Sequence, residues 1–394
     1  MITTLKTYRV FGTILFTLSL LAFAGLFSIA NAEEGFLAKS KEYSPVDPNS
    51  IEDLLNHLET AVKGNYDKIE TWQGVMEFTS LHRYYGDSVN QALKIREINV
   101  EVAPNSCEEL AGGTINFKAD LKRDMRWVHL NRTKGLILRD AETMQILYGP
   151  AAFDSQVIRT PDIIMQATPG QYAKDGSTSK RNVIKVGKRE NALDYRAMRE
   201  FGGYPTRFFN AIGPTWTFLS TFKTMLFHKD TTPKTFRDTV VIGKKSIGDD
   251  TEYYIRFGVF NNNNFSDVAS FYEILLPSNA GYNPTLIRIL EAPDNKPSME
   301  YNISYVKLNG VYLPSNFQET HYNPDGKVTL NGQYILKEQK INKVMTEETF
   351  TIKNLGLKNG DKFIDKIEKK EYKYKDANLV FVKDVNEKPI KPNQ

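Results

Sequence analysis

The feature that most constrains this chain is an alternation of apolar and polar side chains with a period of two residues. In the stretch MEYNISYVKL, Met299, Tyr301 and Ile303 fall on one face of an extended chain, and polar residues between them fall on the other. Such strands are typical of antiparallel sheets with one face on a core. Asn309 and Gly310 follow, and Asn-Gly between two such runs is the strongest short hairpin signal. The alternation therefore predicts an antiparallel meander.

The same alternation recurs along most of the chain. The predicted strands of the second half are 252–260, 269–276, 285–291, 299–308, 311–322 and 328–336, with a turn at NPDG, 323–326. In the first half, ALKIREINVEV, TINFKADL, DMRWVHL and TMQILY have the same character. An open sheet of roughly ten or more strands tends to curl. We therefore predict a mainly β fold with covering helices, in which a large curved antiparallel sheet (a half-barrel) carries helices on its concave face.

An amphipathic helix precedes these strands. Ser50 followed by Asp53 resembles a capping box. The apolar residues that follow lie on one helical face, and they are Ile51, Leu54, Leu55, Leu58 and Val62. Gly64 is the predicted end of the helix.

The start of the chain has the layout of a secretory signal peptide. Lys6 and Arg9 precede an apolar run at 10–27, and Ala30-Asn31-Ala32 forms an Ala-x-Ala cleavage site. The competing interpretation is an uncleaved membrane anchor, because the apolar run nearly spans a bilayer. We expect an exported protein, periplasmic or held in the cell envelope, with residues 1–32 removed after Ala32.

The rest of the chain shows no linker that would divide it. Residues 33–49 are predicted to form a flexible leader, and residues 386–394 a tail. Between them we expect one half-barrel domain at 50–385, interrupted by a helical segment at 194–228.

That helical segment contains an unusual aromatic stretch, YPTRFFNAIGPTWTFLSTFKTMLF, at 204–227. Pro214 is incompatible with the middle of a helix but suits its first turn, so a helix is predicted over 215–228. Its apolar stripe contains the side chains we expect to line a ligand site, with one further residue at the mouth of that site. These residues are Trp216, Leu219, Phe222 and Met225, with Phe208 at the mouth.

Three environments could hold this helix. A membrane span is excluded by its length and by Lys223. An interfacial helix needs a basic polar face, whereas this polar face is mainly Thr and Ser. Burial remains, either as ordinary packed core or as one wall of a cavity that accepts an acyl chain.

The layout resembles the LolA/LolB-like half-barrel superfamily. The resemblance rests on an exported chain, an amphipathic helix, YDKIETWQG at 66–74 and a long meander interrupted by helices. Larger secreted relatives resemble it also at LPSNFQETHYNPDGKV, 313–328, and ETFTIKNLGLKNGDKFID, 348–365. The resemblance implies a curved sheet whose hollow face encloses the acyl chains of lipoproteins. This chain is longer than the small periplasmic carriers and lacks the lipid-anchor cysteine of the outer-membrane receptor.

Signals for catalysis, metals and nucleic acid are weak. The five histidines are scattered, and there is no Gly-x-Ser-x-Gly elbow, P-loop or dinucleotide fingerprint. Cys107 is the single cysteine and is followed by two glutamates, which disfavour a thiolate. The formal net charge of +4 is too small for a nucleic-acid footprint. The basic stretch at 174–190 is interpreted as a solvated surface, with contact to anionic head groups as the alternative.

We therefore expect a non-enzymatic, exported carrier or binding protein without cofactor or metal. Its predicted partners are a hydrophobic ligand, such as a lipid or an acylated lipoprotein, and a membrane-associated delivery partner. The alternative is a cell-envelope structural or interaction module with a fully packed core. A third, weaker hypothesis is a hydrolase whose carboxylates converge only in the fold.

Overall fold

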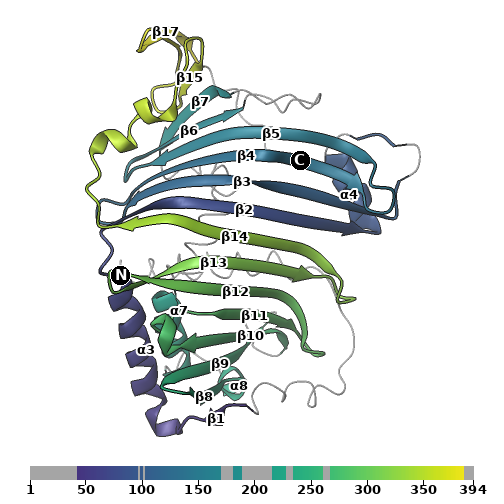
Figure 1. The fold of residues 1–394 in the computed structure, drawn as a ribbon, viewed down its shortest axis with the longest axis vertical. Helices are drawn as coiled ribbons and strands as arrows, with labels where there is room; N and C mark the ends of the chain where they lie inside the picture. Colours follow the sequence, from purple (N-terminus) through teal and green to yellow (C-terminus); the bar gives the residue numbers. More distant parts are fainter. Residues whose placement is uncertain are drawn as a thin grey trace.

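A computed structural model describes residues 42–95, 98–100, 103–169, 181–188, 215–227, 234–260 and 267–385 of the 394-residue chain (Figure 1). Within these residues, seventeen strands form one sheet. From one edge to the other the strands are β1 (Ser44–Pro45), β8 (Val241–Ile247), β9 (Asp250–Phe260), β10 (Val268–Pro277), β11 (Leu286–Glu291), β12 (Lys296–Leu308), β13 (Val311–Tyr322), β14 (Val328–Ile341), β2 (Thr71–Tyr85), β3 (Ser106–Asp120), β4 (Met125–Asp140), β5 (Ile146–Arg159), β6 (Ile163–Pro169), β7 (Arg181–Lys188), β15 (Lys362–Asp365), β16 (Lys370–Lys375) and β17 (Asn378–Asp384).

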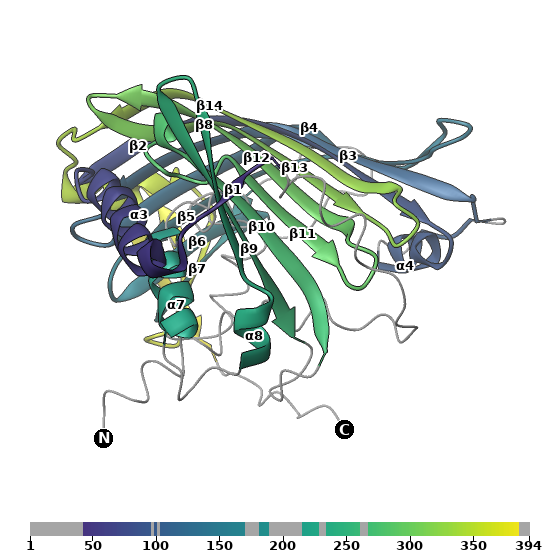
Figure 2. The ribbon, with the colours of Figure 1, turned by 90° about the horizontal axis from the view of Figure 1, so that it is seen from below.

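Neighbouring strands are antiparallel except for β7 and β15, which run parallel. Within the described residues, β1 pairs only with β8 and β17 pairs only with β16, so the sheet does not close on itself. Figure 2 shows the strands arching over a hollow face. The predicted fold class, a large curved antiparallel sheet, is confirmed.

Helices cover part of that hollow face. Figure 2 shows α3 (Ile51–Tyr66), α7 (Thr215–Phe227) and α8 (Lys234–Asp238) beneath the arch, and α4 (Asp87–Ile95) near the opposite end of the strands. Four short 3-10 turns complete the described elements, and they are η1 (Pro48–Ser50), η2 (Ser278–Ala280), η3 (Glu347–Phe350) and η4 (Ile352–Leu355). The helices therefore lie on the concave face, as the fold class predicts.

The largest apolar cluster joins the helices to the sheet. It contains Leu58 of α3, Leu219 of α7 and Phe236 of α8, together with side chains such as Met76 of β2 and Phe317 of β13. A second cluster lies under β4–β7 and the turns η3 and η4, and a third lies under α4. The main core is thus the layer between the concave face and the helices α3, α7 and α8.

The hairpin predicted at Asn309-Gly310 is confirmed. Both residues have positive φ, 50° and 77°, as a two-residue turn between twisted strands requires. The predicted strand 311–322 coincides with β13. The NPDG turn is closed by a 2.8 Å hydrogen bond from the amide of Gly326 to the carbonyl of Asn323.

The predictions for α4 and for the start of α3 need correction. The described part of the segment 92–102 is not a strand, because residues 92–95 complete α4 and residues 98–100 have no regular structure. Val89, Ala92 and Leu93 are buried at helical spacing, and this period prevails over the alternation seen further on. The second correction concerns the start of α3. Ser50 makes no side-chain cap for α3, and its hydroxyl instead donates to the carbonyl of Asp47.

The helix α3 also continues past Gly64 to Tyr66. Part of the segment predicted as a leader forms β1, which pairs with β8. The signal segment 1–32 and the tail 386–394 lie outside the described residues, as does most of the helical segment 194–228 before α7.

Candidate ligand-binding face

The helix α7 is held against α3 by apolar packing and by one polar tether. Leu219 and Phe222 expose 0% and 2% of their surface. Beside them, Lys223 Nζ donates to Glu59 Oε2 and to Asn56 Oδ1, both at 2.7 Å, and both acceptors belong to α3. The ion pair is partly exposed, so we assign it about 1 kcal/mol at most. Apolar burial is therefore what mainly fixes α7.

An aromatic cluster connects α7 and α8 to the sheet. The ring of Phe222 lies 5.3 Å from that of Phe257 and 6.3 Å from that of Phe236, measured between centroids. Phe257 in turn stacks on Tyr272 at 5.4 Å. Burial raises the pKa of Tyr272 to about 12. Four rings in edge, tilted and stacked contact make this part of the concave face dry.

The structure brings together three of the five predicted site residues. Leu219 and Phe222 belong to the main core cluster, and Met225 packs against it while remaining partly buried. Trp216 belongs to α7, but its side chain is not described, and Phe208 lies outside the described residues. The assignment of these side chains to a ligand site stays a prediction.

A pocket of about 770 Å³ lies elsewhere on the helical side, between the start of α3 and the strands β8 and β9. Its lining consists of residues from these elements and from the segment that precedes α3, and they are Glu42, Ser44, Pro45, Val46, Asp47, Ser50, Asp53, Leu54, His57, Lys244, Lys245, Ser246 and Tyr253. Within the described residues, this pocket is built by α3 rather than by α7.

The pocket has no single sign of charge. Two of its lining residues, Glu42 and Lys245, form an ion pair at 2.9 Å. His57 meets the ring of Tyr282 edge-on at 5.3 Å, and Tyr282 lies 6.0 Å from Tyr253. Such a mixed lining suits a small polar group better than an acyl chain. Sequence reasoning missed it because its residues come from three segments that only the fold brings together.

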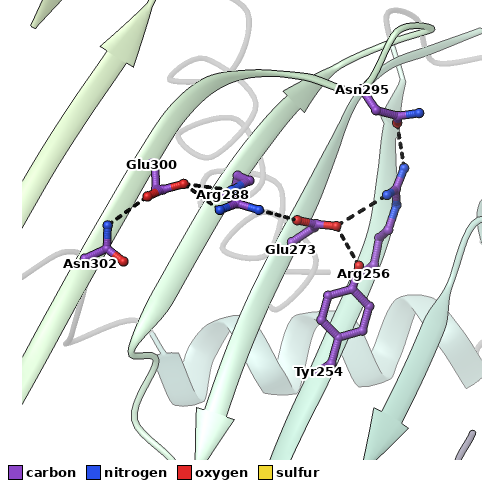
Figure 3. Close-up of polar contacts among 7 residues, drawn as sticks. All are labelled: Tyr254, Arg256, Glu273, Arg288, Asn295, Glu300 and Asn302. Atoms are coloured by element: carbon purple, nitrogen blue, oxygen red, sulfur yellow. Dashed lines mark hydrogen bonds and ion pairs between the residues drawn. The ribbon is translucent and has the colours of Figure 1, made fainter. Parts of the chain in front are cut away.

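A ladder of alternating charges crosses β9 to β12 on one face of the sheet (Figure 3). Arg256 Nη1 lies 3.4 Å from Glu273 Oε1, and Arg288 Nη1 lies 3.5 Å from Glu273 Oε2. Arg288 also contacts Glu300 Oε2 at 2.7 Å. The hydroxyl of Tyr254 donates to Glu273 Oε1 at 2.6 Å. Each charged residue stands directly opposite the next in the strand register.

This ladder lies on the face opposite the main core. Ile255 and Phe257 of β9 pack with that core, so the alternate residue Arg256 points away from it. Arg256 is only 1% exposed, and its guanidinium lies 4.1 Å from the ring of Phe271 and donates to Asn295 Oδ1 at 2.8 Å. Burial lowers the pKa of Arg256. Tyr254 and Glu273 oppose that shift. A one-residue slip would remove every one of these pairs, so the ladder fixes strand register.

The described residues contain no cluster of three or more His, Cys, Asp or Glu side chains able to hold a metal ion. Two histidines pair with carboxylates on neighbouring positions, His129 with Asp154 at 2.7 Å and His321 with Glu319 at 2.6 Å. Cys107 is fully buried under α4.

The curved sheet and its covering helices define a large open half-barrel protein.

No family model matches the sequence, and a search of curated proteins finds no significant match. Among the solved structures that are similar to the chain are the following three. A DUF1329 family protein from Desulfovibrio piger ATCC 29098 shares 6% identity over 79% of this chain and 100% of its own, with a TM-score of 0.32. A putative outer membrane lipoprotein-sorting protein domain from Vibrio parahaemolyticus shares 9% identity over 77% of this chain and 98% of its own, with a TM-score of 0.31.

The third is a β-barrel-like protein of the DUF1849 domain from Brucella abortus, with 9% identity over 70% of this chain and 99% of its own and a TM-score of 0.24. As the sequence predicted, a lipoprotein-sorting domain is among the structures that the chain resembles. At these TM-scores the likeness carries no argument about ligand or activity. Among the described helices, none combines the length and apolar character needed to cross a bilayer.

Proposed function

We propose that the protein is a non-enzymatic carrier that binds a hydrophobic ligand, a lipid or a lipoprotein acyl chain, between the curved sheet and α7. The observation that carries the proposal is the continuity of the apolar stripe of α7. It runs from the fully buried Leu219 and Phe222 to Met225 and Leu226, which are partly buried, and to Phe227, which is 36% exposed. An apolar surface that begins in the core and ends at solvent offers an acyl chain a path along the helix.

Burial of an acyl chain would supply enough free energy for binding. Each methylene removed from water contributes about 0.8 kcal/mol, so an acyl chain gains several kcal/mol even after the cost of association. Leu219 and Phe222 leave no exposed surface for a ligand to cover. A chain therefore lies along the Met225 margin, or it displaces α7 from the sheet. The second route breaks the tether between Lys223 and Glu59.

A structural or interaction module with a packed core is the second candidate. The near-complete burial of Leu219 and Phe222 favours it, because a ring that is 2% exposed already has protein neighbours on all sides. In that case α7 stabilises the domain and binds nothing.

The two candidates differ in what a charge at the margin of α7 does. We expect Met225→Asp to weaken binding of a fluorescent palmitoylated peptide by about tenfold or more, since a buried carboxylate would face the chain. Thr224→Asp is the matched control, because Thr224 is exposed on the same helix. Equal affinity of both variants, or no binding by the unmodified protein, supports the packed-core module. Phe222→Asp is the stronger variant, and if it left both folding and binding unchanged, the site assignment would be wrong.

We further propose that the protein works in the cell envelope, after export and cleavage following Ala32, and that it receives or delivers its ligand through a membrane-associated partner. N-terminal sequencing of the protein recovered from the periplasm tests the first part. A chain beginning at Glu33 is expected, and recovery of the intact segment 1–32 in the membrane fraction would favour the anchor.

A further inference from the structure

Three buried polar side chains converge over Gly332 on the concave face. In the strand register Gly332 of β14 stands between Glu319 of β13 and Ser80 of β2. The third group is the hydroxyl of Tyr334, because a Cβ built on Gly332 would lie 2.9 Å from that oxygen. A side chain at position 332 would collide with this hydroxyl unless the Tyr334 ring moved.

The convergence lies on the ligand side of the sheet. Phe78, two residues before Ser80 on β2, belongs to the main core cluster, and so does Tyr334. Side chains two residues apart on a strand share a face. Ser80, Tyr334 and Glu319 expose 4%, 2% and 0% of their surface. A group that contacts them is therefore shielded from bulk water.

Ser80 makes this cluster more than a structural contact. Its Oγ is buried and has no hydrogen-bond partner. A buried hydroxyl left in that state is unfavourable, because its lost contacts with water are not replaced. Its strand neighbours on both sides are small, Gly332 and Ala111, and the ring end of Tyr334 lies over Gly332 beside it.

The surroundings combine negative charge with aromatic rings. Glu319 Oε1 lies 2.6 Å from His321 Nε2. The ring of Phe317 lies 5.4 Å from that of Tyr334 and 5.5 Å from that of Tyr301. Oxygen acceptors beside aromatic rings favour a cation over an anion or a neutral group.

We propose that this cluster, called the Gly332 site and formed by Ser80, Glu319 and Tyr334 over Gly332, binds the primary ammonium group of an amphiphilic ligand. An ammonium group has three N–H donors, and the site presents three oxygen-bearing side chains. A quaternary ammonium has no donor for Ser80, and a carboxylate or phosphate would meet Glu319 in a medium that strengthens their repulsion. The inference rests on the proposed function, since the acyl chain of the same ligand lies against the adjoining apolar core.

Three twelve-carbon probes separate the inference from the proposed function. Dodecylamine, dodecanol and dodecanoate carry the same chain with a cationic, a neutral and an anionic head. In isothermal titration calorimetry at pH 7 we expect dodecylamine to bind about tenfold or more tightly than dodecanol, because hydrogen bonds to a charged group are stronger than those to a neutral hydroxyl. Dodecanoate is expected to bind most weakly.

Variants locate the preference. Ser80→Ala is expected to weaken dodecylamine several-fold, to leave dodecanol unchanged and to raise the unfolding temperature, because it deletes an unsatisfied hydroxyl. Glu319→Gln is expected to bring dodecylamine to the affinity of dodecanol. Glu77→Gln is the matched control, since Glu77 is half-exposed on β2 and pairs with Lys337.

The outcomes are distinct. Binding of all three probes with equal affinity, or loss of the amine preference in Glu77→Gln but not in Ser80→Ala, overturns the inference and leaves the carrier function standing. Failure of every probe to bind overturns both. If Glu319→Gln does not fold, the Ser80→Ala comparison still decides.

Discussion

Replacing Phe222 by alanine tests whether α7 is packed on the sheet as described. The ring is 2% exposed and contacts Phe257 at 5.3 Å and Phe236 at 6.3 Å. The substitution removes buried ring surface and leaves a cavity that only helix movement can fill. Buried Phe→Ala changes cost about 3–5 kcal/mol. We expect the lower part of that range, because a single helix such as α7 can shift and partly close the cavity.

The assay is urea unfolding followed by circular dichroism, with the free energy of unfolding extrapolated to water. Phe227→Ala is the control, because Phe227 lies on the same helix with 36% of its surface exposed. We expect the control to cost less than about 1 kcal/mol. A cost below about 1 kcal/mol for Phe222→Ala as well would refute the docking of α7 and the binding face built on it.

Further predictions concern the sheet. Gly243→Ala places a Cβ 2.6 Å from the Cβ of Tyr43. We therefore expect the free energy of unfolding to fall by about 1–3 kcal/mol. Unchanged thermal unfolding would contradict this contact. Glu273→Gln removes the charge that faces Arg256. Breaking a buried pair in this way is expected to lower the free energy of unfolding in urea by about 3–5 kcal/mol. A change near zero would show that the ladder is solvated. Burial raises the folded-state pKa of Tyr272 to about 12, above about 10 in the unfolded chain, so its contribution to stability is present below pH 10 and is lost as pH rises through 12. Tyr272→Phe should make that alkaline loss of unfolding free energy shallower, and an identical pH profile would remove Tyr272 as a cause.

Local signals were sufficient wherever one short segment determines its own geometry. Asn309 and Gly310 both adopt positive φ, which few other residue pairs accept, so the turn and the register of β12 with β13 follow from the sequence. The helix stripe containing Leu219 and Phe222 was likewise placed correctly on α7, because i, i+3 spacing is a property of that segment alone.

Competing periods explain the failure at α4. The segment 92–102 alternates in its second part, but Val89, Ala92 and Leu93 are buried on one helical face, and Val89 and Leu93 pack against Cys107. The helix begins at Asp87, before the segment predicted as a strand. Residues 92–102 alone therefore contain only the last turn of the helical pattern.

Pairings between distant segments have no local signal. The parallel contact of β15 with β7 and the charge ladder through Arg256 and Glu273 depend on a register that only the folded sheet defines. The Gly332 site is of the same kind, because Ser80 and Glu319 lie on strands far apart in the chain. Their chemistry appears only when β2, β14 and β13 stand side by side.

The central claim is that the concave face carries a hydrophobic ligand. Native mass spectrometry of the exported protein, purified without detergent and compared with the Met225→Asp variant, tests it most directly. We expect a stoichiometric additional mass that solvent extraction identifies as a lipid and that the variant has lost while still folded. An unliganded mass for both proteins, unchanged after incubation with palmitoylated peptide, would contradict the claim and leave α7 as part of a packed core.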